Sequence, residues 1–178
     1  GQTSLAATFE ITEMSCMAPG GYWQAIQQAN ASLGRDTIQV RKSFTVDDCT
    51  HFPAEQYPDL HVTESVDIVG NGFTVYGNVG FVDADGHFNR HGVCPLDQDG
   101  YLVVGYGGGF IDIGQRNVDN QGIEVTVTGL NMSRLTGVAM VRKNAKLRIE
   151  NSLIQDTYSV YHQVCNEPII FAEDHADL

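Results

Sequence analysis

The sequence predicts an all-β protein: a right-handed parallel β-helix (a solenoid) with one capping α-helix near its N-terminus and one long inserted loop. Three observations support this fold class. The chain has many short runs rich in Val, Ile, Thr and Phe, 19 glycines between them, and a pattern in which the runs recur. With 178 residues the chain has the length of one domain, so residues 1–178 are predicted to form a single unit.

The repeat is clearest in the C-terminal half. VTVTGLNMSRLT begins at Val125 and LRIENSLIQDTY begins at Leu147, an offset of 22 residues. Each segment has two alternating apolar positions, a small or polar corner, and a further apolar position. A period of roughly 20–30 residues with short strands and Asn or Gly corners is typical of a β-solenoid. At this period, the chain from residue 60 onward would form about five turns.

The stretch VTESVDIVGNGFTVYGN, residues 62–78, has the same shape, with Gly70-Asn71-Gly72 at its corner. Such a corner is also typical of a β-hairpin, in which the two halves would pair with each other. In a solenoid each half pairs instead with the turns above and below it. The likeness to the two later segments favours the solenoid.

Residues 1–59 are predicted to form an N-terminal cap, and residues 60–178 the turns of the β-helix. Alternation in residues 5–14 predicts a first strand. In residues 21–33, Trp23, Ile26 and Leu33 lie near helical spacing, and Gly34 is placed to end this helix. Residues 36–40 predict a strand, whereas residues 81–100 show no strand pattern and are expected to form the inserted loop.

The N-terminal part resembles the start of CSLREA-type right-handed parallel β-helix proteins. The resemblance lies in Cys16, in YWQAIQQAN ending at Asn30, in the Asp-Thr-Ile that begins at Asp36, and in VDIVGNGFTV from Val66 to Val75. The C-S-L-R-E run itself is replaced by CMAPGGYWQ. The resemblance implies an exported bacterial protein, secreted or at the cell surface, often with no known catalytic role. A helix before the first turn would cover the open apolar end of the solenoid.

The four cysteines are widely spaced, and an even number of this kind favours two disulfides in an exported protein. Three pairings are possible. Cys16–Cys49 and Cys94–Cys165 are favoured, because each closes a segment that the chain pattern treats as a unit. Four buried free thiols are the alternative. The chain begins without an initiator Met, as a mature exported protein does after its signal peptide is removed, although a shortened chain would begin in the same way.

The charge of the chain narrows the classes of partner. A net charge of -12 disfavours contact with nucleic acid and with anionic membrane surfaces. The sequence holds no apolar run of about 18 residues, so no membrane span is predicted.

Two D-x-D-G elements lie in the expected loop and are candidate ligands for Ca²⁺, which prefers oxygen donors. Asp and Gly are also the usual residues of plain turns, and no other cofactor is predicted. His87 and His91 lie between these elements and are expected to be loop residues. The candidate calcium ligands are Asp83, Asp85, Asp97 and Asp99.

Parallel β-helices also include polysaccharide lyases and hydrolases, which need paired carboxylates, or calcium with a base. The spacing of the acidic and basic residues does not distinguish such a site from solvent-facing strand positions, so no catalytic residue is assigned. The residues that would supply such a site are Asp112 and Asp119, with Arg134, Arg142, Lys143 or Arg148 as basic partners.

The expected function is therefore that of an exported, non-enzymatic structural protein. Its solenoid has a helical cap at one end and no polar cap visible at the other, and an uncapped end pairs with further strands. We expect a filament or surface subunit that contacts copies of itself end to end. An adhesin-like or carbohydrate-binding domain is the alternative, and a polysaccharide lyase or hydrolase is a third. The residues expected to form the assembly surface are Pro168, Ile169, Ile170 and Phe171.

Overall fold

The computed structural model describes most of the N-terminal and C-terminal parts of the chain. Side chains are described in residues 6–46, 49, 61–77, 109–135, 137–155, 157, 170–173 and 175–178. Three further strands are described by their backbone alone, at residues 81–82, 88–89 and 103–104.

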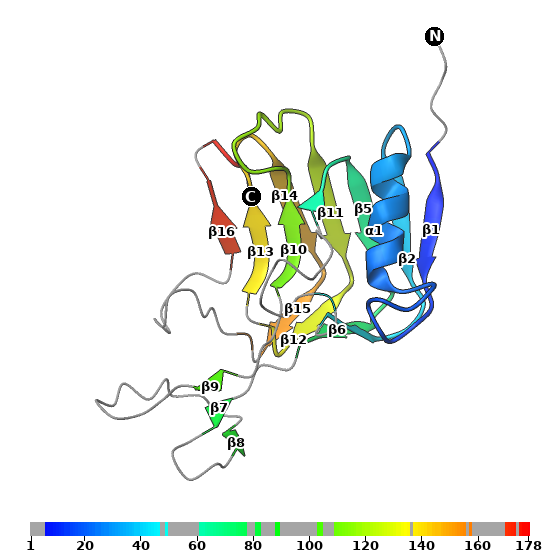
Figure 1. Ribbon diagram of the computed structural model, residues 1–178, viewed down its shortest axis with the longest axis vertical. Helices are drawn as coiled ribbons and strands as arrows, with labels where there is room; N and C mark the ends of the chain where they lie inside the picture. The colour runs from blue at the N-terminus through cyan, green and yellow to red at the C-terminus, as the bar shows by residue number, and fades with distance from the viewer. Residues whose placement is uncertain are drawn as a thin grey trace, which may run out of the picture.

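The described strands form three parallel sheets, and the chain passes through the sheets in a repeating order (Figure 1). This arrangement confirms the predicted parallel β-helix. Sheet 1 contains β1 (Thr8–Ile11), β2 (Asp36–Val40), β5 (Val66–Val69), β11 (Glu124–Thr128) and β14 (Lys146–Glu150). Sheet 2 contains β3 (Phe44–Thr45), β6 (Thr74–Tyr76), β12 (Asn131–Ser133) and β15 (Leu153–Gln155). Sheet 3 contains β4 (His61–Val62), β10 (Gly109–Ile113), β13 (Gly137–Val141) and β16 (Ile170–Ala172).

The register of the sheets confirms the 22-residue repeat. Val125 pairs with Leu147 and Val127 with Ile149 in sheet 1. In sheet 2, Met132 pairs with Ile154. The inward side chains of successive coils therefore stack in rows, and the rows in the middle of the solenoid are fully buried.

The repeat is not regular enough to predict the number of coils. Among the described residues after position 60, sheet 1 contains three strands, β5, β11 and β14, so the expectation of about five turns is wrong. The reason is that coil length varies. The chain advances 30 residues from Asp36 to its partner Val66, 59 from Val66 to Val125, and 22 from Val125 to Leu147.

The 59-residue advance contains the insertion. In it, β7 (Phe81–Val82) pairs antiparallel with β8 (Phe88–Asn89) and with β9 (Val103–Val104), in a sheet separate from the other three. The inserted loop expected at residues 81–100 lies within this insertion, and β7 and β8 are two short strands inside it. Strands of two residues are too short to show the alternation by which strands are recognised in a sequence.

The corner at Gly70-Asn71-Gly72 joins β5 of sheet 1 to β6 of sheet 2, which excludes a hairpin. Asn71 and Gly72 both have positive φ, 52° and 78°. Gly70 lies so close to the next coil that a Cβ atom there would clash with the backbone of Leu130. The Asn71 side chain donates to Val40 O of the previous coil at 3.0 Å. The corner therefore ties three successive coils together.

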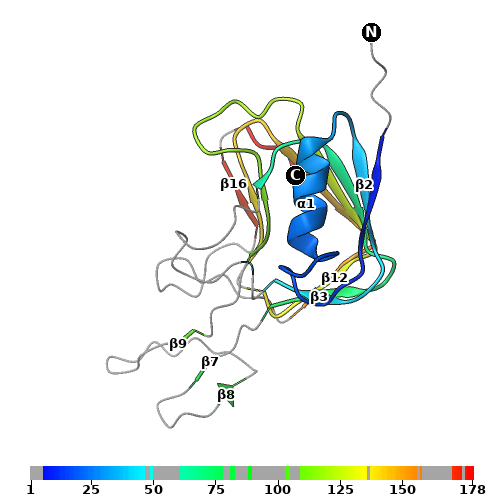
Figure 2. The ribbon, with the colours of Figure 1, turned by 45° about the vertical axis from the view of Figure 1, so that its right-hand side comes forward.

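Helix α1 (Tyr22–Ala31) lies over the N-terminal opening of the solenoid, as Figure 2 shows. Tyr22 and Ile26 of this helix are buried. The Tyr22 ring packs against Phe44 and Phe110 at centroid distances of 5.1 and 5.5 Å. The Tyr22 hydroxyl donates to Phe110 O at 3.0 Å, and burial raises its pKa. The helix thus has the capping position expected from the sequence.

Two further contacts hold this cap. A disulfide joins Cys16 to Cys49, which confirms the pairing favoured for these two residues. Asn30 donates to His61 O at 2.7 Å and accepts from Thr63 N at 2.9 Å, so the helix satisfies backbone groups at β4. The helix ends at Ala31 with Ser32 as its C-cap, two residues earlier than residues 21–33 predicted. Cys94 and Cys165 lie outside the described residues.

We predict that the two glycines of the corner tolerate alanine differently. Gly70→Ala should lower the free energy of unfolding by about 3 kcal/mol, because the new methyl group overlaps the next coil. Gly72→Ala meets open space and bears only the strain of positive φ, about 1 kcal/mol. Denaturant unfolding of both variants measures the difference. Equal losses would show that the coils are not in close contact at Gly70.

Candidate functional site

The two ends of the solenoid differ in how they bury their inward side chains. At the N-terminal end α1 covers the opening, and Ile38 of the first full coil is 0 % exposed. In the last coil Ile149, Ile154 and Ile170 are only partly buried, although they align with buried residues of the coil before. These three isoleucines are as apolar as the residues with which they align in the coil before, so their greater exposure is due to their position. The last coil therefore presents an apolar surface at the C-terminal end of the stack.

Two exposed apolar side chains of the same coil lie on the outer faces of the sheets. Leu153 of β15 is 52 % exposed and continues the outward row of Thr74 and Asn131. Phe171 of β16 is 47 % exposed and continues the outward row of Asp112 and Met140. Ile170 and Phe171 were expected at the assembly surface, and both lie in β16 of the last coil. Pro168 and Ile169 lie outside the described residues. We call the exposed edges and inward side chains of β14, β15 and β16 the C-terminal face.

The backbone of β14 is only partly paired on this face. Lys146 N donates to Ile123 O, and Glu150 O accepts from Gly129 N, so these residues bond toward the coil before. Because bonding direction alternates along a strand, the N–H and C=O of Leu147 and Ile149 point to the C-terminal side. Leu147 N donates to Asp177 O at 2.9 Å. The N–H and C=O of Ile149 make no hydrogen bond to the described residues on that side.

Asp177 begins a further row of sheet 1. It forms a parallel bridge to Lys146, and its N–H donates to Ala145 O at 3.1 Å. Leu178 comes next in the chain and is 66 % exposed. The first part of β14 is therefore paired with the chain itself, while no strand among the described residues pairs with Arg148, Ile149 and Glu150 on that side.

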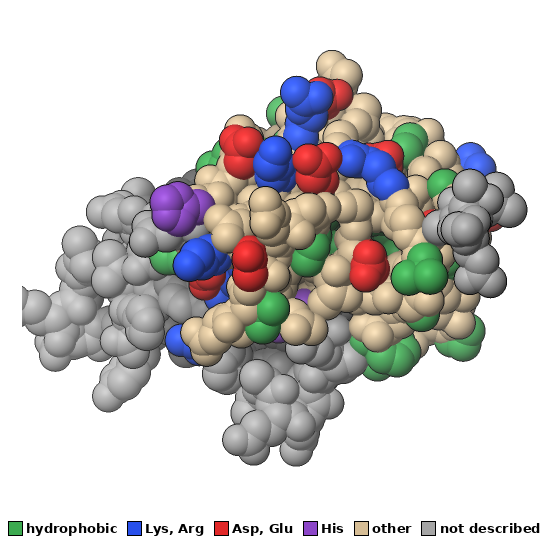
Figure 3. Space-filling view, turned by 90° about the horizontal axis from the view of Figure 1, so that it is seen from above, with side chains coloured by type: hydrophobic (Ala, Val, Ile, Leu, Met, Phe, Trp, Pro, Cys, Tyr) green, Lys and Arg blue, Asp and Glu red, His purple; other side chains and the backbone are tan. Residues whose placement is uncertain are grey.

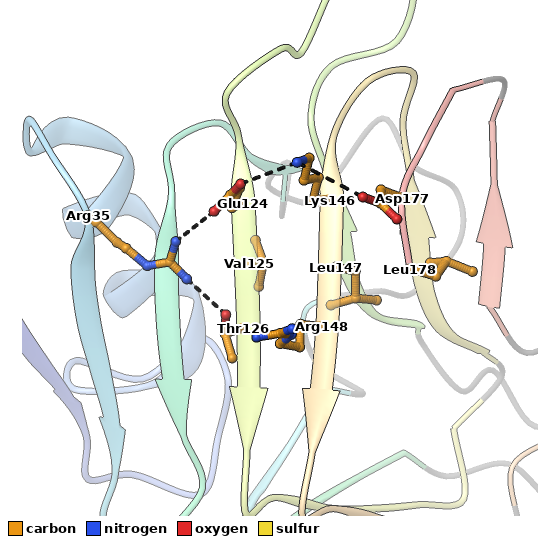
Figure 4. Close-up of a pocket in the computed structure, with 9 residues that line it drawn as sticks. All are labelled: Arg35, Glu124, Val125, Thr126, Lys146, Leu147, Arg148, Asp177 and Leu178. Carbon is orange, nitrogen blue, oxygen red and sulfur yellow. Dashed lines mark hydrogen bonds and ion pairs between the residues drawn. The ribbon is translucent and has the colours of Figure 1, made fainter.

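An open groove lies on the outer face of sheet 1, next to this edge (Figure 4). Its cations are paired: Arg35 binds Asp67 at 2.7 Å and Glu124 at 3.0 Å, and these contacts raise the pKa of Arg35. Figure 3, seen from above, shows positive and negative side chains interspersed, with no large patch of one sign on the face drawn. The groove is lined by Arg35, Glu124, Val125, Thr126, Lys146, Leu147, Arg148, Asp177 and Leu178.

Arg148 is the most exposed charged residue of β14. Its side chain is 74 % exposed, and its Nε lies 3.5 Å from the Glu150 carboxylate. A contact of this length between exposed side chains holds neither residue firmly. Arg148 and Glu150 are thus available to an incoming strand.

A second charged cluster lies on sheet 3. Arg142 donates twice to the Asp112 carboxylate, at 3.0 and 2.7 Å, and once to Glu173 at 3.0 Å. His61 Nδ1 lies 3.1 Å from Asp112 Oδ2. Burial alone would lower the pKa of Arg142, but its hydrogen bonds to the two carboxylates raise it. One guanidinium therefore holds both carboxylates and ties the coils of sheet 3 together.

Among the other residues considered for catalysis, Lys143 contacts this cluster through its backbone, whereas Asp119 and Arg134 lie at a turn and a corner elsewhere on the coils. Asp119 accepts from Gln121 N and from the Asn144 side chain, which lowers its pKa, and it organises an exposed turn. Arg134 has a positive φ of 56° at a corner. Lys143 contributes its backbone N–H to Glu173.

The described part of the chain offers no group of three or more His, Cys, Asp or Glu side chains placed to hold a metal ion. The candidate calcium ligands Asp83, Asp85, Asp97 and Asp99, with His87 and His91, lie outside the described residues, so calcium binding stays a prediction. Within the residues whose structure is described, no helix has the length and apolarity needed to cross a membrane.

Comparison with known proteins adds no relative: no family model, curated protein or solved structure matches the chain. The parallel sheets agree with the resemblance to CSLREA-type proteins. Because no comparison identifies a family, membership of that family stays a prediction.

Nothing in the local sequence distinguishes Ile149 or Asp177. Ile149 has the same pattern as Val127, and only its position in the last coil makes it different. Asp177 lies in a polar stretch without a strand pattern, so no sequence pattern predicts its pairing with β14.

We predict that the sheet 3 cluster makes stability depend on acid pH. Burial opposes ionisation of Glu173, but hydrogen bonds from Arg142 and Lys143 N lower its pKa below the ordinary value of about 4.3. The ionised form then stabilises the fold at neutral pH, and this stabilisation is lost as the pH falls through the lowered pKa.

Glu173→Gln should therefore be less stable than the unchanged chain at pH 7, and this difference should shrink below about pH 4. Denaturant unfolding at pH 7, 4 and 3 measures it. Glu13→Gln, an exposed pair partner of Lys42, is the matched control and should have little effect at any pH. A constant difference between Glu173→Gln and the unchanged chain would contradict the prediction.

Proposed function

We propose that this protein is an exported, non-enzymatic structural subunit that joins a neighbour end-on through β-strand pairing. Extracellular filaments and surface subunits are built from contacts of this kind. The observation that carries the proposal is the difference between the two ends: α1 closes one, and the C-terminal face leaves core residues and a strand edge accessible. An exposed edge next to apolar side chains is the ordinary template for adding a strand.

Export is supported by the Cys16–Cys49 disulfide, which indicates an oxidising compartment outside the cytoplasm. The resemblance of residues 16–75 to CSLREA-type β-helix proteins agrees with a secreted or cell-surface location. We propose that location for this protein, with the disulfide holding the cap in place.

A structural role agrees better with the charged residues than hydrolysis does. A glycosidase needs one carboxyl group that is protonated and another that is free to attack or to activate water. Here Asp112 and Glu173 are both bound to Arg142, and the pKa of Glu173 is lowered. The lowered pKa of Glu173 does not favour a proton donor at neutral pH.

An adhesin-like or carbohydrate-binding role has less support. Binding sites for small molecules and sugars are commonly lined by aromatic and apolar side chains. Among the described strands of sheet 1, the outward side chains include no aromatic ring. They are Thr8, Glu10, Thr37, Gln39, Asp67, Val69, Glu124, Thr126, Thr128, Lys146, Arg148 and Glu150.

The proposal predicts that the purified chain associates as its concentration rises. Sedimentation velocity from micromolar to millimolar protein should show a concentration-dependent shift to larger species, and electron microscopy should show particles elongated along the solenoid axis. Introducing a charge into the C-terminal face, as in Ala172→Lys, should weaken association without unfolding the protein, because Ala172 is exposed although it continues the inward row of Ile113 and Val141. Monomers at every concentration would overturn the proposal.

A further inference from the structure

We propose that Asn71 and Gly72 form a self-modification site, a deamidation site that the folded corner holds inactive. An Asn followed by Gly is the pair most prone to deamidate, because glycine leaves the backbone nitrogen unhindered. The sequence contains one such pair, at residues 71–72, and both residues are exposed. The site lies in the corner between β5 and β6 and does not depend on the proposed function.

Deamidation consumes only water. The Gly72 backbone nitrogen loses its proton and attacks Cγ of the Asn71 side chain. The new N–Cγ bond replaces the Cγ–Nδ2 bond, and ammonia leaves. Water then opens the resulting succinimide ring and gives a carboxylate at position 71, as aspartate or as isoaspartate. The reaction therefore requires a free Gly72 nitrogen and an Asn71 side chain that can turn toward it.

The folded corner meets neither requirement. Gly72 N donates to Gly129 O of the next coil at 2.8 Å, so its proton is held in a hydrogen bond. The Asn71 side chain is held on the other side, where Nδ2 donates to Gln39 Oε1 and to Val40 O of the coil before, each at 3.0 Å. The two reacting groups are thus fixed to different coils, and the corner must open locally before they can react.

The product cannot re-form the bonds of the corner. A carboxylate at position 71 accepts hydrogen bonds and does not donate them. Val40 O and Val69 O, which lie 3.0 and 3.4 Å from Asn71 Nδ2, are carbonyl oxygens that also only accept. The carboxylate would therefore face oxygens with which it cannot bond, and the isoaspartate form would also lengthen the backbone. Deamidation thereby converts a transient opening of the corner into a permanent loss of its tie to the coil before.

A second exposed turn supplies a matched control. Asn117 has a positive φ of 62°, close to the 52° of Asn71, and its side chain makes no hydrogen bond to the described residues. Val118 follows it and is 48 % exposed. The change Val118→Gly would place an Asn-Gly pair in this turn without removing a buried side chain. The two pairs then differ in whether the neighbouring coils restrain them.

Deamidation of the Val118→Gly protein tests the inference. The folded protein and the same protein in denaturant are incubated in mildly alkaline buffer, and mass spectrometry follows the peptides that contain residues 71 and 117. Both sites should react at similar rates in denaturant. In the folded protein residue 117 should still react, and residue 71 should react at least about tenfold more slowly than in denaturant, because only the open corner reacts. Equal rates at the two sites in the folded protein would overturn the inference.

Further variants test whether the named contacts are responsible. Gln39→Ala removes one acceptor of the Asn71 amide, and Gly70→Ala crowds Gly129 O, which holds the Gly72 nitrogen. Each should raise the rate at residue 71 several-fold in the folded protein and leave the rate in denaturant unchanged. Asn71→Asp reproduces one product and should unfold at a lower denaturant concentration than the unchanged chain. A folded-state rate unaffected by Gln39→Ala, or an Asn71→Asp variant of unchanged stability, would contradict the proposal.

Discussion

A coil of this protein buries its inward side chains fully only where another coil or helix α1 covers it on each side. The row formed by Phe9, Ile38, Ile68, Val127 and Ile149 shows the consequence. Ile38, Ile68 and Val127 have a neighbour on both sides and are fully buried, whereas Ile149 is only partly buried at the C-terminal end. Tyr22 and Ile26 of α1 close the other end. The stacking of coils therefore buries the interior rows and also determines how much apolar surface each end of the solenoid exposes.

The same stacking explains the corners and the charged clusters. Gly70 lets two coils approach closely, and the Asn71 side chain reaches a carbonyl of the coil before. Arg142 bonds to Asp112 and Glu173, which lie 30 and 31 residues away in sequence but on neighbouring coils. These charges therefore have a structural use, which argues against a hydrolytic role for the acidic residues of sheet 3.

Much of the fold could be predicted because its pattern is local. The apolar alternation around Val125 and Leu147, the corner at Asn71 and the helix before Asp36 each lie within about a dozen residues. The number of coils could not be predicted, because coil length changes from 30 to 59 to 22 residues. The open edge at Ile149 could not be predicted either. Its sequence is that of a core residue, and its exposure is set by its place in the last coil of the stack and not by its neighbours in the chain.

An exposed strand edge next to apolar side chains would pair with many strands if nothing restricted it. Here the restriction is visible in β14. Asp177 already pairs with the first part of the strand, so among the described residues of β14 only Arg148, Ile149 and Glu150 are left without a pairing strand on that side. Their outward charges are of opposite sign, so a partner strand must present complementary charges in one register.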